Sequence, residues 1–400
     1  MSFPAVLERG DDFLSEYPRR SKAWAFISHA ACVLVVGGSK LVLNIAYRPE
    51  VTGLEKLDAA LERSKRENRG IITVMNHMSV VDDPFLWGCL PWKYFRDVDV
   101  IRWGLAASNV CFKGTFLSYF FSAGKILSTE RFGRGPFQPS LDATVRLLSP
   151  DDTMDPGFMF VPSPKASLLH WIKSPLTQKI KEIDSKPYHP PVMRHCPSWI
   201  HVFPEGFVCQ LQPPHSNSMR YFRWGASRLV LEPTVPPIVV PIFSTGFEMI
   251  QPESGAENIF ERYLPQNYGQ EIKVVIGDPV DDKVIEDFRK EWKNLCEKEY
   301  DRNNPRDLSH ELKFGKQAKD LRSRVAAELR QNVLNIRNQL GFNPEDPRLK
   351  DPKFWKRYTN SKGLSDPDIK FIGKNWAVKE YQAKVKSYDE FGNEIKDDQR

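Results

Sequence analysis

His77 and Asp82 are the two side chains in this sequence whose types and spacing best suit acid–base chemistry. A neutral imidazole can take the proton of a hydroxyl group and return it in a later step. A carboxylate bonded to the other ring nitrogen fixes the tautomer and stabilises the imidazolium. The pair could therefore activate an alcohol that a substrate supplies. The alternative is a structural contact, in which an Asp in a turn satisfies a neighbouring His.

The residues around the pair indicate how the chain brings it together. Residues 71–75 form a short, apolar, partly β-branched run after Gly70, which predicts a buried strand. Asp83 and Pro84 predict a helix start, with Asp83 as the N-cap. Five positions separate the His from the Asp, which would put them roughly 140° apart on a helix and on opposite faces of a strand. We therefore expect the two side chains to meet across an irregular turn.

Four blocks of sequence, in this order, resemble the motifs of the glycerophospholipid acyltransferase family. The first is the His-x4-Asp spacing itself, and the others follow at 124–131, 203–206 and 239–242. The residues beside the first two blocks, 76–84 and 132–135, resemble the branch that moves acyl chains directly between phospholipids. The resemblance covers roughly residues 20–300. It is specific because all four blocks occur in order.

The resemblance implies a role for each motif residue. It makes His77 the catalytic base and Asp82 its orienter, and it leaves Asp83 as the N-cap. It makes Arg131 a phosphate ligand, which suits the bidentate fork of a guanidinium, although a salt bridge at a strand end is the structural alternative. The expected substrate-binding residues are Asn76, Lys125, Arg131, Pro204, Glu205 and Gly206.

Two of these assignments stay open at the level of sequence. Lys125 lies on the same face as Arg131 only if the strand expected at 125–131 is regular through both residues. Glu205 could bond to the glycerol of a substrate, or it could anchor the loops of the site. The donor that stabilises the oxyanion cannot be named, although N–H groups at a turn or a helix start would suit that role.

The reaction that the resemblance implies is CoA-independent acyl transfer from a phospholipid to a lysophospholipid, which remodels the acyl chains of cardiolipin. Such an ester exchange needs no cofactor, and no metal site is expected. The alternatives are an acyl-CoA-dependent lysophospholipid acyltransferase of the 1-acylglycerol-3-phosphate type, and a non-catalytic membrane scaffold. The implied partners are membrane phospholipids and lysophospholipids, including cardiolipin and lysocardiolipin, with a homo-oligomer or mitochondrial membrane complexes as further candidates.

Composition sets broader limits on the function. The chain has 400 residues, of which 41% are hydrophobic, so it can bury a full-sized core. The net charge of +6 implies no strong field for nucleic acid, and a mild basic bias suits an anionic membrane surface. Six cysteines form no C-x-x-C pair. His189, His195 and His201 recur among prolines without a common zinc spacing, so we expect them in loops.

Two segments could contact a membrane. Residues 23–47 are mostly apolar but only marginally long for a span, so we expect a helix lying in one leaflet, with a core helix as the alternative. Residues 216–231 read as a basic amphipathic helix that suits either a membrane surface or a core with snorkelling arginines. Acidic residues within 1–22 argue against a cleavable presequence. Because neither segment is long and apolar enough for a clear span, we expect a monotopic protein, and the resemblance implies a mitochondrial membrane, facing the intermembrane space.

The remaining pattern predicts an α/β fold, with a central mixed sheet flanked by helices as in the glycerolipid acyltransferases. We expect an N-terminal segment at 1–48, an acyltransferase domain at 49–300 with a proline-rich insertion at 150–198, and a helical, polar C-terminal extension at 301–400. Strands are predicted at 71–75, 98–101, 125–131, 199–203, 237–243 and 272–276, and helices at 54–69, 112–121 and 321–340.

Overall fold

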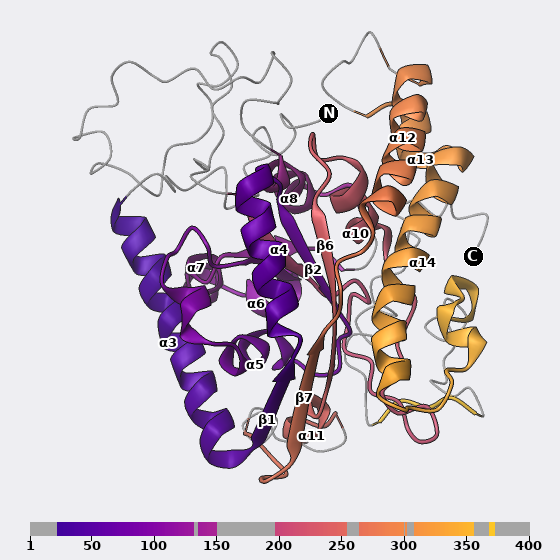
Figure 1. Ribbon diagram of the computed structural model, residues 1–400. Helices are drawn as coiled ribbons and strands as arrows, with labels where there is room; N and C mark the ends of the chain where they lie inside the picture. The colour runs from indigo at the N-terminus through magenta and orange to yellow at the C-terminus, as the bar shows by residue number, and fades with distance from the viewer. Residues whose placement is uncertain are drawn as a thin grey trace.

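A seven-stranded mixed sheet runs through the centre of the protein, as the computed structural model shows (Figure 1). The structure describes residues 22–131, 135–149, 197–253, 264–299, 301, 308–355 and 368–372. The strand order is β1-β7-β6-β2-β5-β3-β4, and β6 and β7 form the antiparallel pair. The strands are β1 (Arg48–Thr52), β2 (Ile71–Met75), β3 (Trp103–Ala107), β4 (Ile126–Thr129), β5 (Trp199–Val202), β6 (Ile238–Thr245) and β7 (Glu271–Ile276).

The strands β6, β2, β5, β3 and β4 are parallel to one another, so their carboxyl ends meet at one edge. All five residues of β2 are buried, which is why its sequence is a continuous apolar run without alternation. Three of the motif blocks follow or include the carboxyl ends of β2, β4 and β5, and the fourth, 239–242, lies within β6. The sheet topology therefore gathers segments that are far apart in sequence at a single edge.

Helices cover both faces of this sheet and bury two apolar clusters (Figure 1). One face packs against α3 (Lys22–Ala46), α4 (Leu54–Glu67) and α5 (Asp82–Cys89). The other face packs against α8 (Pro139–Leu148), α10 (Trp224–Leu231), α12 (Asp282–Lys298), α13 (His310–Phe314) and α14 (Lys316–Gln339). The expected mixed α/β fold with flanking helices is confirmed.

The strand predicted at 98–101 is wrong. The N–H groups of Val100 and Ile101 both donate to the carbonyl of Asp97, which makes this stretch a turn. The strand β3 begins only at Trp103. Alternating apolar residues resemble a strand, but here a short Asp-initiated turn satisfies the backbone instead. The helix predicted at 112–121 is α7 (Thr115–Ala123), which begins after Gly114, where φ is 80°.

The helix predicted at 216–231 is shorter than expected, and of the two surroundings left open, a membrane surface and a core, the structure shows the core. Only α10 is helical within it, and residues 219–222 pack into the core as irregular backbone. Arg228 is 2% exposed and pairs with Asp142 at 2.6 Å and with Glu232 at 2.6 Å. The apolar residues of α10 face the sheet and α14, so this segment is a core element and not a membrane surface.

The helix α3 packs along the body of the protein for most of its length. Ser28 donates to the carbonyl of Ala123 at 2.6 Å near one end, and Lys40 donates to the carbonyls of Gly88 and Leu90 at 2.8 Å further along. Its Ala25–Ala46 portion is long and apolar enough to cross a membrane by length and composition. Its outward side carries the exposed side chains of Phe26, Ile27, Leu34, Leu41 and Ile45.

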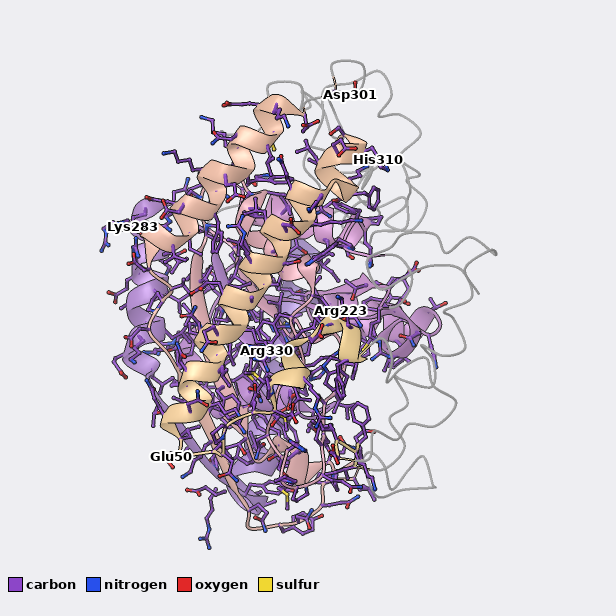
Figure 2. The ribbon with its side chains drawn as sticks, turned by 90° about the vertical axis from the view of Figure 1, so that its right-hand side faces the viewer. Glu50, Arg223, Lys283, Asp301, His310 and Arg330 are labelled. Atoms are coloured by element: carbon purple, nitrogen blue, oxygen red, sulfur yellow. The ribbon has the colours of Figure 1, made fainter. Side chains whose placement is uncertain are left out.

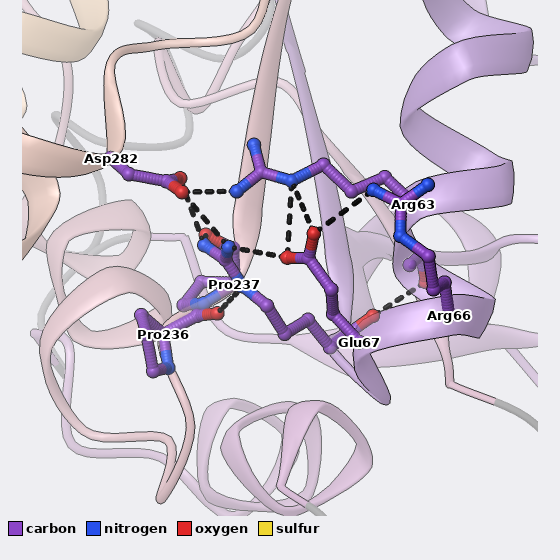
Figure 3. A network of polar contacts seen from close by, with 8 residues as sticks. Arg63, Arg66, Glu67, Pro236, Pro237 and Asp282 are labelled. Carbon is purple, nitrogen blue, oxygen red and sulfur yellow. Dashed lines mark hydrogen bonds and ion pairs between the residues drawn. The ribbon is translucent and has the colours of Figure 1, made fainter.

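A network of hydrogen bonds and ion pairs lies at the amino ends of β2 and β6 (Figure 3). Arg69 donates to the carbonyl of Pro236 at 2.8 Å and pairs with Asp282 at the start of α12 at 3.0 Å. Arg63 of α4 bonds to both Asp282 and Glu67. The network joins α4, the start of β6 and α12 at the edge of the sheet opposite the motif blocks.

The C-terminal extension is part of the same fold where it is described. The helix α14 packs on α10 and β6, and Gly341 follows it with φ of 81°. The short helix η6 (Pro347–Lys350) and residues 351–355 and 368–372 form a third apolar cluster with residues 207–221. Most of the insertion expected at 150–198 lies outside the described residues.

Candidate active site

His77 and Asp82 meet across an irregular turn between β2 and α5, as their spacing predicts. The Nδ1 atom of His77 lies 2.8 Å from Oδ2 of Asp82. The same carboxylate oxygen accepts N–H groups of Met78 at 2.6 Å and Ser79 at 2.9 Å, which fixes the turn around it. Asp82 is fully buried, and burial raises its pKa against the opposing effect of the His77 contact. The side chain of His77 is 20% exposed and lies on a cavity wall.

Asp83 is not the N-cap that the sequence suggests. The helix α5 begins at Asp82, with Val81 as its N-cap, so Asp83 lies in the first turn. Its carboxylate accepts from Nε1 of Trp87 at 3.0 Å and from a guanidinium N–H of Arg102 at 2.5 Å. These contacts tie α5 to the residue before β3 and leave Asp82 alone to contact the histidine.

The segment after β5 supports His77 from a second side. The ring of Phe203 stacks on the imidazole with centroids 4.5 Å apart. Glu205 is fully buried and accepts the backbone N–H of His77 at 2.7 Å and that of Arg220 at 2.7 Å. Burial raises the pKa of Glu205 to about 8. Of the two roles left open by sequence, these contacts favour the anchoring of loops.

Pro204, Gly206 and Arg131 line the cavity near the histidine. Gly206 has φ of 82°, and a Cβ there would lie 2.5 Å from Nε of Arg223. Arg223 donates to the carbonyl of Arg131 at 3.0 Å and to that of Glu205 at 3.3 Å, which links the segments after β4 and β5. Arg131 itself contacts Oδ1 of Asn109 at 3.4 Å.

Asn76 and Lys125 do not line the cavity, although the sequence places both among the substrate-binding residues. Asn76 is fully buried and exchanges hydrogen bonds with the backbone of Ser244 at 2.9 and 2.8 Å, which joins the ends of β2 and β6. Lys125 has φ of 59°, so the strand is not regular through it, and its ammonium donates to the carbonyls of Val98 and Ile101. This geometry therefore favours a structural role for both side chains over direct contact with a substrate.

The cavity has a volume of about 1570 Å³ and crosses the carboxyl edge of the sheet. This exceeds the ~300–1,000 Å³ usual for the site of one small ligand. On one side it is lined by apolar residues of α3 and α7, including Cys32, Val36 and Phe121. On the other side it is lined by residues 221–226, by α14 and by Lys350 and Pro352.

Sequence reasoning missed several residues of this site. Arg223 and Arg102 have no motif around them, because their contacts arise only when distant strands meet. The share of α3 in the cavity wall likewise depends on tertiary packing. His201, expected in a loop, is buried in β5, where its Nδ1 atom lies 2.8 Å from Oγ1 of Thr73. Within the described ranges, no group of three or more His, Cys, Asp or Glu side chains could hold a metal ion.

The sequence compares well with known acyltransferases. The acyltransferase family model matches residues 48–245. The tafazzin of Saccharomyces cerevisiae is 56% identical over 384 residues, which is 96% of both chains. The N-acylphosphatidylethanolamine synthase of Arabidopsis thaliana is 28% identical and covers 67% of this chain and 76% of its own.

Among solved structures, the 1-acyl-sn-glycerophosphate acyltransferase PlsC of Thermotoga maritima aligns with a TM-score of 0.34 and 13% identity. That alignment covers 74% of this chain and 78% of PlsC. The strength of the sequence match decides the family. With 56% identity along almost its whole length, the chain is an acyltransferase of phospholipids and belongs to the tafazzin family.

Proposed function

We propose that the protein transfers an acyl chain directly from a phospholipid to a lysophospholipid, without CoA, and thereby remodels cardiolipin. The observation that carries this proposal is the His77–Asp82 pair at the wall of a large, mostly apolar cavity. Membership of the tafazzin family supports the choice of lipid donor over acyl-CoA. The volume of about 1570 Å³ suits a reaction in which two lipids must be held at once.

In the proposed mechanism, Asp82 holds the Nδ1–H tautomer of His77, so Nε2 is the basic nitrogen. That nitrogen takes the hydroxyl proton of the lysophospholipid, and the resulting alkoxide attacks the ester carbonyl of the donor. A tetrahedral intermediate collapses as the protonated His77 gives its proton to the departing glycerol oxygen. One ester bond forms and one breaks, so protons and electrons balance without a co-reactant.

The other site residues would act by binding or by positioning. Arg131 lines the cavity and would hold a lipid phosphate in a bidentate contact. Pro204 and Gly206 would shape the wall at the glycerol position. Glu205 would fix the backbone of His77, and Asn76 and Lys125 would act only by holding the ends of strands in place.

We also propose that the protein sits in one leaflet of a membrane. Because α3 packs lengthwise on the folded domain, it could not cross a bilayer without taking the domain with it. Its exposed side chains and those of Phe116 and Phe120 on α7 provide an apolar surface beside the cavity mouth. Placement on a mitochondrial membrane, facing the intermembrane space, rests on family membership. Alkaline carbonate should leave the intact protein in the membrane pellet.

The decisive experiment uses purified protein, acyl-labelled phospholipid and lysocardiolipin, with and without CoA. The proposal expects label in cardiolipin at the same rate in both reactions, and no label with His77→Ala. Transfer only from acyl-CoA would replace the proposal with a CoA-dependent lysophospholipid acyltransferase. Absence of transfer from either donor would favour a non-catalytic scaffold.

A further inference from the structure

We propose that the C-terminal clamp, defined as residues 345–355 and 368–372, positions the catalytic histidine. The clamp would act through the 203–212 segment that follows β5, and it would set the turnover of the enzyme. This inference rests on the proposed role of His77 as the base. The clamp lies wholly beyond residues 48–245, the region that matches the acyltransferase family, so the catalytic region alone would lack this support.

The first step of the argument is that the 203–212 segment holds the backbone of His77 at both polar groups. Glu205 accepts the N–H of His77 at 2.7 Å, and the carbonyl of His77 accepts the N–H of Cys209 at 2.9 Å. The side-chain amide of Gln210 donates to the carbonyl of Met78 at 2.7 Å. A displacement of this segment must therefore displace the histidine.

The second step is that the clamp holds the 203–212 segment. Gln212 donates its N–H to the carbonyl of Lys370 at 2.8 Å, and Ile372 donates to the carbonyl of Gln210 at 2.9 Å. Leu211 forms an isolated antiparallel bridge with Phe371. The segment does not belong to the main sheet, so this short ladder and the apolar cluster beneath it fix its position. That cluster contains Phe207, Cys209, Leu211, Tyr221, Leu349, Trp355, Ile369 and Phe371.

Arg220 provides a second connection between the clamp and the site. Its guanidinium lies over the rings of Phe207 at 4.6 Å and Trp355 at 5.4 Å, measured to the ring centroids. Its backbone N–H donates to the second carboxylate oxygen of Glu205 at 2.7 Å, and its guanidinium donates to the carbonyl of Glu205 at 3.0 Å. Trp355 is fully buried, so the clamp supplies a fixed ring against which the guanidinium of Arg220 packs.

A third connection runs through α14. Arg330, labelled in Figure 2, donates to the carbonyl of Arg220 at 3.0 Å and to that of Met219 at 2.8 Å. Glu345 of the clamp pairs with Arg330 and accepts the N–H of Met219 at 2.6 Å. Buried charged groups of the C-terminal extension thus bond to the backbone of residues 219 and 220, the second of which contacts Glu205.

Accurate placement matters because a general base acts only within hydrogen-bond reach of the proton it removes. A misplacement of about 1 Å can lower a rate by ~10²-fold. We therefore expect Trp355→Ala to lower kcat by about 10-fold to 10²-fold with a nearly unchanged KM for both lipids. Trp355→Phe keeps a ring beneath Arg220 and should restore most of kcat.

Trp292→Ala is the matched control. Trp292 is also a buried tryptophan, but it lies on α12 in the cluster between the sheet and α14 and does not line the cavity. Both alanine variants should lose thermal stability by similar amounts. Only Trp355→Ala should lose kcat, measured per folded molecule at a temperature where both variants are folded.

Wild-type kcat in folded Trp355→Ala would overturn the proposal, as would an equal loss of kcat in Trp292→Ala. If Trp355→Ala does not fold, Phe371→Ala carries the same comparison, because Phe371 belongs to the same cluster and bridges to Leu211. The test can be run with whichever acyl donor supports turnover. Failure of the transacylase proposal is therefore seen separately, in the wild-type protein.

Discussion

The two ends of the parallel strands use carboxylates in opposite ways. At the carboxyl ends, Asp82 and Glu205 are fully buried and accept backbone N–H groups, and burial raises the pKa of each. At the amino ends, Glu67 and Asp282 are partly exposed and pair with arginines, which lowers the pKa of each. Acidic side chains are thus desolvated at one edge of the sheet and paired with arginines at the other.

This difference separates a functional edge from a structural one. At the amino edge, carboxylates and arginines neutralise one another, which suits a structural role (Figure 3). At the carboxyl edge, buried carboxylates hold an imidazole that is 20% exposed against a cavity. Buried groups with perturbed pKa values beside a cavity are typical of functional sites.

The largest expected effect of a carboxylate change is that of Asp82→Asn. The amide oxygen would still accept the N–H groups of Met78, Ser79 and His77 Nδ1, but it carries no charge to stabilise the imidazolium that forms when Nε2 takes the proton. We expect turnover to fall by ~10²–10⁴-fold in a folded protein. Asp83→Asn is the control, because Asp83 contacts Arg102 and Trp87 and not the histidine. An equal loss in both variants would refute the separate roles of the two carboxylates.

A smaller effect is expected for Arg131→Lys, which keeps the charge and loses the bidentate fork. A lost charge-assisted hydrogen bond of ~1.5–3 kcal/mol corresponds to a rise of roughly 10-fold or more in KM. Arg66→Lys, at an exposed arginine of the amino edge, should leave KM unchanged. Steady-state kinetics on lipid substrates would measure both. An unchanged KM in Arg131→Lys would instead favour a structural salt bridge.

Arg69→Ala should lower the stability of the protein without lowering kcat. Arg69 is 8% exposed and bonds to Asp282, Glu67 and the carbonyl of Pro236. Removing it takes a charged donor from Asp282, Glu67 and the carbonyl of Pro236, at about 1–3 kcal/mol in the free energy of unfolding. Denaturant unfolding and kcat would be measured together. A selective loss of kcat would mean that the amino edge also serves the reaction.

The smallest effect is a difference in pH dependence between the two edges. Glu205 has its pKa raised to about 8 in the folded protein, so its contribution to stability should decline as pH rises from about 4.5 to about 8. Glu67 has its pKa lowered to about 2, so its contribution should decline as pH falls from about 4.5 toward 2. Unfolding of Glu205→Gln and Glu67→Gln at a series of pH values should remove one slope each. Slopes of the same sign would contradict the comparison.

Local patterns predicted much of the sheet and the catalytic turn. Short runs of apolar and β-branched residues located β2, β5, β6 and β7, because such residues are enriched in strands. The His–Asp spacing required an irregular turn, and one is present. The apolar stripe at 321–340 predicted most of α14.

Tertiary contacts determine the conformation of several segments that the local sequence patterns did not predict. Residues 219–222 have helical spacing of apolar and basic side chains, yet Arg330 and Glu345 bond to their backbone and hold it as irregular core. Lys125 follows a motif glycine, but its positive φ sends its ammonium to the carbonyls of a turn that the sequence had suggested was a strand. The contacts of Asp83 with Arg102 likewise depend on strands that meet only in the fold.

The central claim is that His77 is the base of the acyl transfer, and His77→Ala tests it most directly. Transfer of labelled acyl chains to lysocardiolipin would be measured in the wild type, in His77→Ala and in Arg69→Ala, with unfolding midpoints for all three. The account predicts that His77→Ala keeps its fold and loses turnover by ~10²–10⁴-fold, while Arg69→Ala loses stability and keeps its turnover. Full activity in a folded His77→Ala protein would contradict it.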